Sequence, residues 1–410
     1  MIQTIPLAAL LLPFASAPGD EIAPRPLAED EELAPLAALW ADRMDTFDVP
    51  GAAVAVVRDG EVFVHAMGVR DADGRLAVDA HTMFYIASIT KTFTAMAACA
   101  LVEDGLVELD DPVAELLPRF DLPDGHEEIE ESATLRDLLS HRWGINSGPV
   151  VLLDAYTGEI TDERYWHWLA RGSVAGRPVY TNVNFTLAGQ IVEEAAGKDW
   201  RDWLQTRVLE PAGMTRTTGY ASRLYGDPNS AVPMERGADG FVPTAQRKTD
   251  RTMHAAGGLG ISAADGARWV LLNLGHGAIA DARVLDADLM EEMHFPHQEL
   301  DRGSILRVVE QKGFCLGWQQ GVIEGVPVRM HGGGYVGAFA FVALLHEHDA
   351  GFFLLANSGG LANAWGMAVA ADITRAVTGA ERTSARWEQL GRLAERSRED
   401  GEGDGPATTT

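Results

Sequence analysis

Two residues, Ser88 and Lys91, have the types and the spacing that acyl transfer through a serine can use. On a helix, residues three positions apart share one face, so the lysine ammonium would lie beside the serine hydroxyl. Mostly apolar residues flank the pair at 85–87 and 93–97. Because burial lowers the pKa of a lysine, Lys91 could act as the base that activates Ser88. The helix start would also offer free N–H groups to an oxyanion.

The composition of the chain makes a chance match to the Ser-x-x-Lys spacing less frequent. The chain has 410 residues with 33 Lys and Arg, and only four of these are lysines. A compositional bias toward arginine explains the scarcity, and it leaves a motif that needs lysine few chances to arise by accident. Lys91 is the only lysine that follows a serine by three residues.

A second motif, Tyr180-Thr181-Asn182, precedes a predicted helix. A tyrosine beside a lysine can share its proton and act as an acid or a base. The asparagine amide can form a hydrogen bond with a substrate amide and help to hold the lysine. On its own, a Tyr-x-Asn pattern is more often a turn.

A third motif, His331-Gly332-Gly333-Gly334, follows a predicted strand. Glycines at a strand edge let another backbone come close. A substrate could therefore add to this edge as an extra strand, and the Gly334 N–H could complete an oxyanion hole. Residues 332–337 also match the G-x-G-x-x-G pattern of dinucleotide-binding sites. A predicted strand follows them where such a site needs a helix, so the match does not indicate a dinucleotide site.

The elements that would position these motifs come from both ends of the chain. Two β-type runs at 52–57 and 61–67 surround a turn at 58–60, which predicts a hairpin. Further strands are predicted at 314–320, 326–330, 338–346 and 352–356. Helices are predicted at 29–47, 88–103, 135–140, 162–170, 184–196, 263–274 and 362–377, with an acidic loop at 121–132. The pattern predicts an α/β fold of the α+β type, in which an antiparallel sheet built from both chain ends is flanked by helices and by a mostly helical inserted region.

The composition and the charge exclude several classes of protein. The 60 Asp and Glu give a formal net charge of −27, and no run rich in Lys or Arg is present to bind a nucleic acid. Apolar residues make up 46% of the chain, which is typical of a folded globular protein. The two cysteines, Cys99 and Cys315, are too few for a disulfide framework and lie in patterns typical of core residues.

The ends of the chain predict an exported protein, secreted or periplasmic. Residues 1–17 carry no charge and fit a signal peptide, and residues 18–28 are rich in proline and fit a linker. A single domain is expected at 29–380, followed at 381–410 by a charged helix and a disordered tail. Beyond the signal peptide no transmembrane segment is predicted.

With its three motifs in this order, the sequence resembles the penicillin-recognising serine hydrolases, and most of all the branch of class C β-lactamases, DD-peptidases and esterases. The resemblance covers about residues 29–380. It is carried by FYIASITKTFT (84–94), TLRDLLSHRWGI (134–145), YTNVNFTLAGQIVEEAA (180–196) and MHGGGYVGAF (330–339). The resemblance implies the β-lactamase/transpeptidase-like fold and a site that needs no metal and no organic cofactor.

The resemblance also implies a role for each matching residue. Ser88 would be the acylated nucleophile, and Lys91 and Tyr180 would share the general acid/base work, with either of them as the base. The residues implied in substrate binding are Asn182, His331, Gly332 and Gly333. The backbone N–H groups of Ser88 and Gly334 would form the oxyanion hole. His141 falls at a family position taken as structural.

His331 stands where β-lactamases of this group usually carry a lysine. A lysine is a fixed cation for a substrate carboxylate, whereas an unperturbed histidine is mostly neutral at pH 7. We therefore expect hydrolysis of an ester or amide bond through an acyl-enzyme. The alternatives are a DD-carboxypeptidase or D-aminopeptidase, a β-lactamase, and a non-catalytic module that binds peptidoglycan or β-lactams. The expected partners are small ester, peptide or β-lactam substrates, and the sequence leaves the oligomeric state open.

Overall fold

The structure is a computed structural model that describes residues 22–300, 308–379, 387, 389–392 and 394. The segment expected as a signal peptide, 1–17, lies outside the described residues, and so does most of the segment 381–410. Within the segment 18–28, Arg25 and Pro26 form β1 at the edge of the main sheet.

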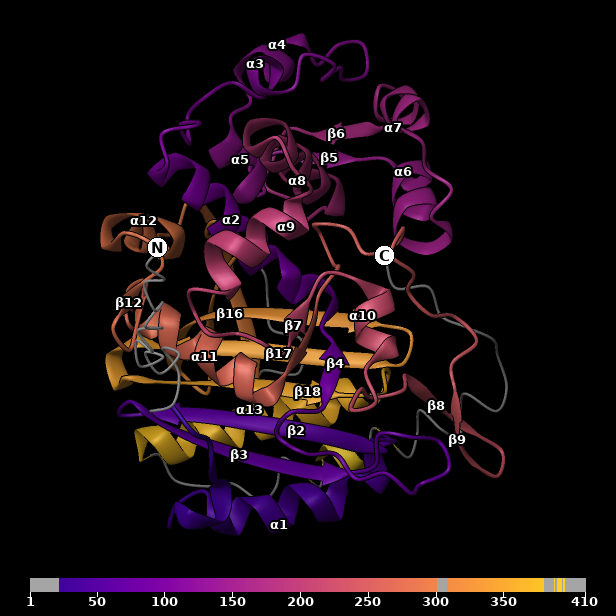
Figure 1. Ribbon diagram of the computed structural model, residues 1–410, viewed down its shortest axis with the longest axis vertical. Coiled ribbons are helices and arrows are strands. Elements are labelled where there is room, and N and C mark those ends of the chain that lie inside the picture. Colours follow the sequence, from indigo (N-terminus) through magenta and orange to yellow (C-terminus); the bar gives the residue numbers. More distant parts are fainter. Residues whose placement is uncertain (1–21, 301–307, 380–386, 388, 393, 395–410) are drawn as a thin grey trace, which may run out of the picture.

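A nine-stranded sheet forms the lower half of the molecule in Figure 1. In spatial order its strands are β1 (Arg25–Pro26), β3 (Glu61–Gly68), β2 (Gly51–Arg58), β18 (Ala350–Ala356), β17 (Ala338–Leu345), β16 (Val326–Tyr335), β15 (Gln319–Ile323), β14 (Val309–Phe314) and β13 (Gln298–Glu299). Neighbouring strands are antiparallel except β1 and β3, which are parallel. β2, from the N-terminal part of the chain, pairs with β18, from the C-terminal part. The predicted sheet, built from both ends of the chain, is therefore confirmed.

The hairpin of β2 and β3 shows how the sequence specifies this pairing. Its turn residues Asp59 and Gly60 have φ values of 52° and 77°. Positive φ at both positions gives a two-residue turn whose twist matches that of the strands. β2 lies between β3 and β18 and is buried along almost its whole length. A strand covered on both faces needs a continuous apolar run, which is why 52–57 shows no alternation.

Helices cover both faces of the sheet (Figure 1). On one face lie α1 (Ala34–Arg43) and α13 (Ala362–Thr378), where the indole N–H of Trp365 donates to the carbonyl of Trp40 at 3.1 Å. On the other face lies α11 (Ala263–Leu274), and α2 (Thr90–Glu103) packs against it. The rings of Phe93 and Trp269 stack between these two helices, with their centroids 3.7 Å apart.

The inserted helical region lies above the sheet in Figure 1. Its helices are α3 (Val113–Leu116), α4 (Glu127–Ser132), α5 (Leu135–Leu139), α6 (Gly148–Leu152), α7 (Asp162–Leu169), α8 (Asn182–Ala196) and α9 (Trp200–Leu204). The π-helical turns η4 (Leu153–Thr157) and η5 (Gln205–Leu209) continue α6 and α9. Two further helices are α10 (Ala221–Gly226), which lies nearer the sheet in Figure 1, and α12 (Ala287–His294), which lies level with α2 and α9 in that view.

Short strands and 3₁₀ turns complete the described chain. β4 (Met83–Tyr85), β10 (Gly260–Ser262) and β7 (Thr217–Thr218) form a three-stranded sheet. The two-stranded pairs are β5 (Gly144–Asn146) with β6 (Ser173–Ala175), β8 (Met234–Gly237) with β9 (Gly240–Pro243), and β11 (Ala278–Ile279) with β12 (Ala282–Arg283). The 3₁₀ turns are η1 (Leu27–Glu29), η2 (Asp45–Phe47), η3 (Ala87–Ile89) and η6 (His346–His348).

Several predicted segments are wrong in part. Of the helix expected at 29–47, only Ala34–Arg43 is α-helical. The strand expected at 314–320 is interrupted, because β14 ends at Phe314 and β15 begins at Gln319. Between them Gly317 has a φ of 72°, and a Cβ at this position would lie 2.6 Å from the carbonyl oxygen of Lys91. The chain therefore turns here to pass close to α2. The acidic segment 121–132 is not a loop throughout, since α4 occupies Glu127–Ser132.

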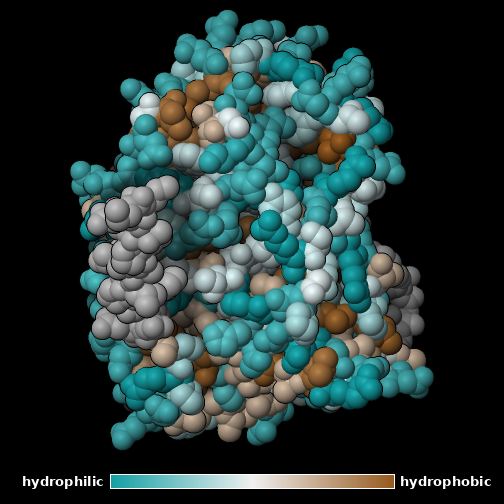
Figure 2. Space-filling view, in the orientation of Figure 1, coloured by the Kyte–Doolittle hydropathy of each residue, from teal (hydrophilic) through white to brown (hydrophobic). Residues whose placement is uncertain are grey.

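Among the described residues, no helix is both long and apolar enough to cross a bilayer. The face shown in Figure 2 is mostly hydrophilic, in agreement with the acidic composition of the chain.

Candidate active site

Ser88 lies on the sharp turn η3 between β4 and α2. The residue before it, Ala87, has a φ of 45°, in the left-handed region that a residue with a Cβ rarely adopts. Such strained positions persist where surrounding structure holds them, often at functional sites. The Ser88 side chain is half-buried, whereas the residues on either side of it are buried. The turn therefore presents one hydroxyl at the start of an otherwise buried helix.

Lys91 lies one turn further on and is fully buried. Its Nζ donates to Ser88 Oγ at 3.2 Å, to Asn182 Oδ1 at 2.8 Å and to the carbonyl oxygen of Ala256 at 2.6 Å. Burial lowers the pKa of Lys91 well below its usual 10.5. A neutral amine keeps two N–H groups, enough for Asn182 and Ala256, and turns its lone pair toward the proton of Ser88. This geometry fits a general base at Ser88.

Tyr180 completes the group around Ser88 and Lys91. The Lys91 Nζ lies 4.8 Å from the centre of the Tyr180 ring. Burial raises the pKa of Tyr180 above its usual 10.0, and a hydrogen bond with the Ser88 side chain offsets part of that rise. The same burial thus favours the protonated tyrosine and the neutral lysine. Tyr180 is then a proton donor at neutral pH.

His141, which the sequence marked only as structural, holds the backbone on both sides of Tyr180. Its carbonyl oxygen accepts the N–H of Val179 at 3.2 Å, and its Nδ1 accepts the N–H of Thr181 at 3.4 Å. Its ring lies 4.7 Å from that of Tyr180. Burial first, and then the charge of Lys91, lowers the pKa of His141 well below 6.5, which keeps Nδ1 free to accept.

Asn182 begins α8, two residues earlier than the sequence predicts. Thr181 is the N-cap, and its Oγ1 accepts the N–H of Asn184 at 3.4 Å. A capping threonine satisfies a backbone N–H that has no partner within the helix. This start places the Asn182 side chain within reach of Lys91, as the 2.8 Å hydrogen bond between them shows.

The third motif lies inside β16, not after a strand as the sequence predicts. Residues 331–335 pair with β17 on one side, while the pairing of β16 with β15 ends at Met330. Within the described residues, the other side of 331–335 has no partner strand. A Cβ at Gly333 would lie 2.0 Å from the carbonyl oxygen of Ile86, so only glycine fits there. The glycines let this edge approach the turn that carries Ser88.

His331 is a neutral group beside the other site residues. It is buried, and its Nδ1–H donates to the carbonyl oxygen of Gly332 at 2.7 Å. Burial and then the charge of Lys91 lower the pKa of His331 to about 3, although the hydrogen bond to Gly332 raises it in part. Its ring lies 6.0 Å from the ring of Tyr180. At neutral pH, this position therefore carries no cation for a substrate carboxylate.

A second buried lysine, Lys248, is not predicted from any sequence motif. Its Nζ donates to the carbonyl oxygens of Ala155 at 2.5 Å and Thr252 at 3.4 Å, and it lies 4.2 Å from the centre of the Tyr335 ring. Burial lowers its pKa to about 8, and the charge of Asp154 raises it in part. The scarcity of lysine could have singled this residue out, but no motif surrounds it.

The fold and this arrangement of side chains define the class of the protein, and comparison with known proteins gives the family. The Beta-lactamase family model matches residues 36–373, and the chain belongs to that family. Penicillin-binding protein 4 of Amycolatopsis lactamdurans is 30% identical over 336 residues, which are 78% of this chain and 85% of that protein. The unguisins hydrolase ungD of Aspergillus violaceofuscus (strain CBS 115571) is 25% identical over 377 residues, 84% of this chain but only 63% of that protein.

Solved structures share the fold. The octameric penicillin-binding protein homologue from Pyrococcus abyssi aligns with a TM-score of 0.72 and 23% identity, over 91% of this chain and 82% of that chain. The D-amino acid amidase from Ochrobactrum anthropi SV3 aligns with a TM-score of 0.68 and 21% identity, over 89% of this chain and all of that chain. The protein is thus a serine hydrolase with a β-lactamase/penicillin-binding-protein fold.

Proposed function

We propose that this protein hydrolyses an ester or amide bond through an acyl-enzyme formed on Ser88. The observation that carries the proposal is the buried ammonium of Lys91, 3.2 Å from Ser88 Oγ and lowered in pKa by burial. A lysine of this kind can take the serine proton near neutral pH. A pure binding module would need neither this base nor the strained turn before Ser88.

In the proposed reaction, Ser88 Oγ attacks the substrate carbonyl carbon while its proton passes to neutral Lys91. The N–H groups of Ser88 and Gly334 bind the resulting oxyanion. Tyr180 then gives its proton to the leaving group as the carbonyl re-forms, and Lys91 returns a proton to Tyr180. In the second half, water attacks the acyl carbon, loses its proton through the same pair, and Ser88 leaves as the free hydroxyl.

Two features favour a neutral acyl donor over a β-lactam. His331 is uncharged at neutral pH because its pKa is about 3, so it offers no fixed cation to a carboxylate. The edge of β16 at 331–335 is free on one side in the described chain, which suits an extended substrate backbone. That edge also favours a second candidate, hydrolysis of a peptide or D-amino-acid amide. One structural neighbour is named a D-amino acid amidase, and the fungal relative ungD is named an unguisins hydrolase.

One substrate panel on one preparation tests the proposal. It compares nitrophenyl esters of graded acyl length, a D-Ala-D-Ala peptide, a D-amino-acid amide and a chromogenic cephalosporin. We expect esters or amides to be hydrolysed faster than the cephalosporin. Ser88→Ala should abolish turnover, while Ser132→Ala, at an exposed serine on α4, should not change it. Turnover by Ser88→Ala at the wild-type rate would refute the assignment.

We also propose export, from the uncharged apolar segment 1–17. Intact-mass measurement of protein purified from its native host should give a chain that begins near residue 18 or 20. A mature chain that begins at residue 1 or 2 would contradict export by this segment.

A further inference from the structure

A cavity of about 1000 Å³ runs along α8, apart from the Ser88 turn. Its walls come from η4, α7, α8, α9 and the segment 250–255. None of Ser88, Lys91 and Tyr180 is among the described residues that line it. The wall between α8 and the segment 250–255 is tightly packed, because a Cβ at Gly189 would lie 2.4 Å from the Cβ of Ala255. This contact leaves no room for a side chain between α8 and the segment 250–255 at that point.

The cavity wall holds buried polar atoms that have no hydrogen-bond partner among the described residues. The side chains of His254 and Asp154 are only 10% and 15% exposed. Their Nδ1 and Oδ2 atoms lie 3.7 Å apart, too far for a hydrogen bond, and His254 Nδ1 is buried without a partner. Gln190 Oε1 on α8 is likewise buried without a partner. Buried polar atoms in native proteins are normally paired, so a wall of this kind indicates a polar occupant.

Two carboxyl groups, those of Asp154 and Glu193, also line the cavity. Glu193 accepts one hydrogen bond, from the backbone N–H of Trp200 at 3.3 Å. Burial raises the pKa of Asp154 to about 6, although Lys248 lowers it in part, and burial also raises the pKa of Glu193. Both shifts are those of carboxylates that lack a closely bound cation.

Two neighbouring cations direct their N–H groups to other acceptors. Lys248 donates to the carbonyl oxygens of Ala155 and Thr252, although its charge lowers the pKa of Asp154. Arg201 donates twice to Asp199, each time at 2.7 Å, and once to the carbonyl oxygen of Asp250 at 3.0 Å. Neither donates a described hydrogen bond to the Asp154 or Glu193 carboxylate, so both carboxylates can accept N–H groups of a ligand.

Aromatic side chains form part of the same wall. Trp166, Trp200 and Tyr220 line the cavity, and the Arg201 guanidinium lies 4.7 Å from the centre of the Tyr220 ring. Aromatic faces provide apolar contact area and attract cations. The lining thus combines carboxylates, an unpaired amide oxygen and aromatic rings.

We propose that this cavity binds a small organic ammonium ion, with its N–H groups directed at the Asp154 carboxylate and its body against the aromatic wall. Gln190 and Glu193 accept hydrogen bonds from further donors of the ligand or from the water around it. The site is separate from Ser88 and does not depend on the proposed hydrolase mechanism. The cavity nevertheless lies close to the Ser88 turn. A Cβ at Gly257 would lie 3.6 Å from the carbonyl carbon of Ala87, next to Ser88, and 3.7 Å from Cε1 of His254, which lines the cavity.

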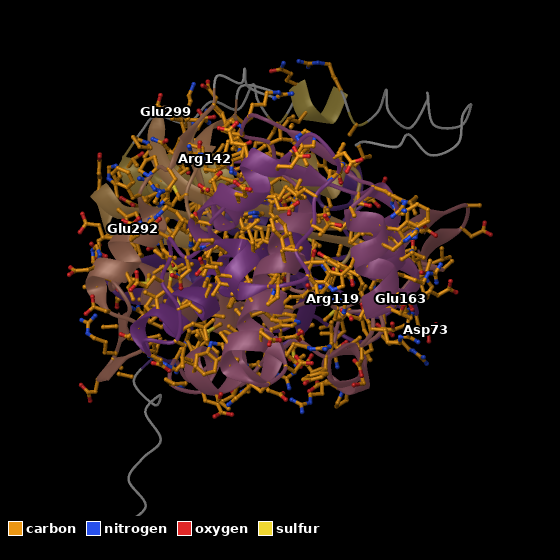
Figure 3. All side chains as sticks on the ribbon, turned by 90° about the horizontal axis from the view of Figure 1, so that it is seen from above. Asp73, Arg119, Arg142, Glu163, Glu292 and Glu299 are labelled. Carbon is orange, nitrogen blue, oxygen red and sulfur yellow. The ribbon has the colours of Figure 1, made fainter. Side chains whose placement is uncertain are left out.

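Isothermal titration of the full chain with 2-phenylethylammonium chloride tests the proposal, with 2-phenylethanol and 3-phenylpropanoate as the neutral and anionic controls. We expect saturable one-to-one binding of the ammonium ion and weaker binding of both controls. Asp154→Asn should weaken the binding about tenfold or more. The matched control is Glu163→Gln, which removes one exposed carboxylate on α7 that does not line the cavity and lies toward the periphery in Figure 3.

Three results would overturn the proposal: no saturable binding of the ammonium ion, equal binding of the alcohol, or equal affinities of Asp154→Asn and Glu163→Gln. Gln190→Leu provides a second variant if Asp154→Asn does not fold, and it should also weaken binding. Ser88→Ala should bind the probe as the wild type does. Loss of binding in that variant would place the probe in the hydrolase site and refute a separate one.

Discussion

Lys91 and Lys248 are both buried, yet their surroundings give them different chemistry. Each donates to a backbone carbonyl, that of Ala256 for Lys91 and that of Ala155 for Lys248. Lys91 also faces the hydroxyl of Ser88, whereas Lys248 has a second carbonyl, an aromatic ring and the charge of Asp154 nearby.

Burial lowers the pKa of both lysines, well below 10.5 for Lys91 and to about 8 for Lys248. Of the two, only Lys91 lies beside a serine hydroxyl. Removal of the hydroxyl proton by Lys91 would activate Ser88 as a nucleophile. Burial thus lowers the pKa of a lysine in either place. The groups that surround its Nζ determine whether the lysine can act as a base or only holds the backbone in position.

The largest expected effect separates the two lysines directly. Lys91→Met should lower kcat/KM for a nitrophenyl ester about 1000-fold, because a general base contributes roughly 100- to 10,000-fold. Lys248→Met removes an equally buried ammonium and should change kcat/KM by less than about fivefold, since the change lies outside the reacting groups. Losses of similar size in two folded variants would contradict the distinction.

A second prediction concerns the proton that leaves with the product. Tyr180→Phe should lower amide hydrolysis about 100-fold and nitrophenyl ester hydrolysis less, because nitrophenolate leaves without a proton. Tyr165→Phe is the matched control, since this buried tyrosine bonds to Thr186 Oγ1 at 3.0 Å, away from Ser88. If Tyr180→Phe slowed both substrates equally, Tyr180 would not be the acid for the leaving group.

A third prediction concerns His141, which acts through Tyr180. His141→Ala should lower kcat about tenfold with a smaller change in KM, because the acceptor of the Thr181 N–H and the ring that packs against Tyr180 would both be lost. His141→Asn should recover part of the rate, since asparagine offers an acceptor and tolerates the φ of 53° at this position. Equal rates of the two folded variants would leave the hydrogen bond to Thr181 without a role.

The smallest effect on activity comes with a measurable effect on stability. The pKa of Lys248 is about 8 in the folded chain, below the usual 10.5, so the unfolded chain binds more protons between these values. Between pH 8 and pH 10.5, this group therefore raises the free energy of unfolding by up to about 1.4 kcal/mol per pH unit. Below pH 8 the lysine is protonated in both states, so it adds no pH dependence.

Urea unfolding across this pH range should therefore give a steeper rise for the wild type than for Lys248→Met. The exposed Lys312 pairs with Glu310 at the surface, so Lys312→Met should keep the wild-type slope. Parallel curves for the wild type and Lys248→Met would show that Lys248 keeps its ordinary pKa.

Local patterns predicted much of the fold and part of the site. The i, i+3 spacing of Ser88 and Lys91 needs only a helical turn to bring them together, and the structure has them 3.2 Å apart. The hairpin at 58–60 follows from residues that accept positive φ. Both features depend on neighbours in sequence, which is why the sequence indicates them.

Long-range packing accounts for what the sequence did not reveal. The sequence predicts the glycine motif after a strand, yet Gly332–Gly334 continue β16, where they pair with β17 and where the carbonyl of Ile86, far away in sequence, leaves no room for a Cβ at Gly333. The strand expected at 314–320 breaks for the same kind of reason, since Gly317 must pass Lys91. Lys248 and the cavity along α8 depend on contacts between distant segments that no local pattern encodes.

The proposed mechanism requires that Ser88 is acylated during turnover. An acid quench of the wild-type protein during hydrolysis of a slow nitrophenyl ester, followed by intact mass and peptide mapping, measures this step. We expect one added acyl group on the peptide that contains residues 84–94, at Ser88, and no such adduct in Ser88→Ala. An adduct at another residue, or turnover by Ser88→Ala at the wild-type rate, would contradict it.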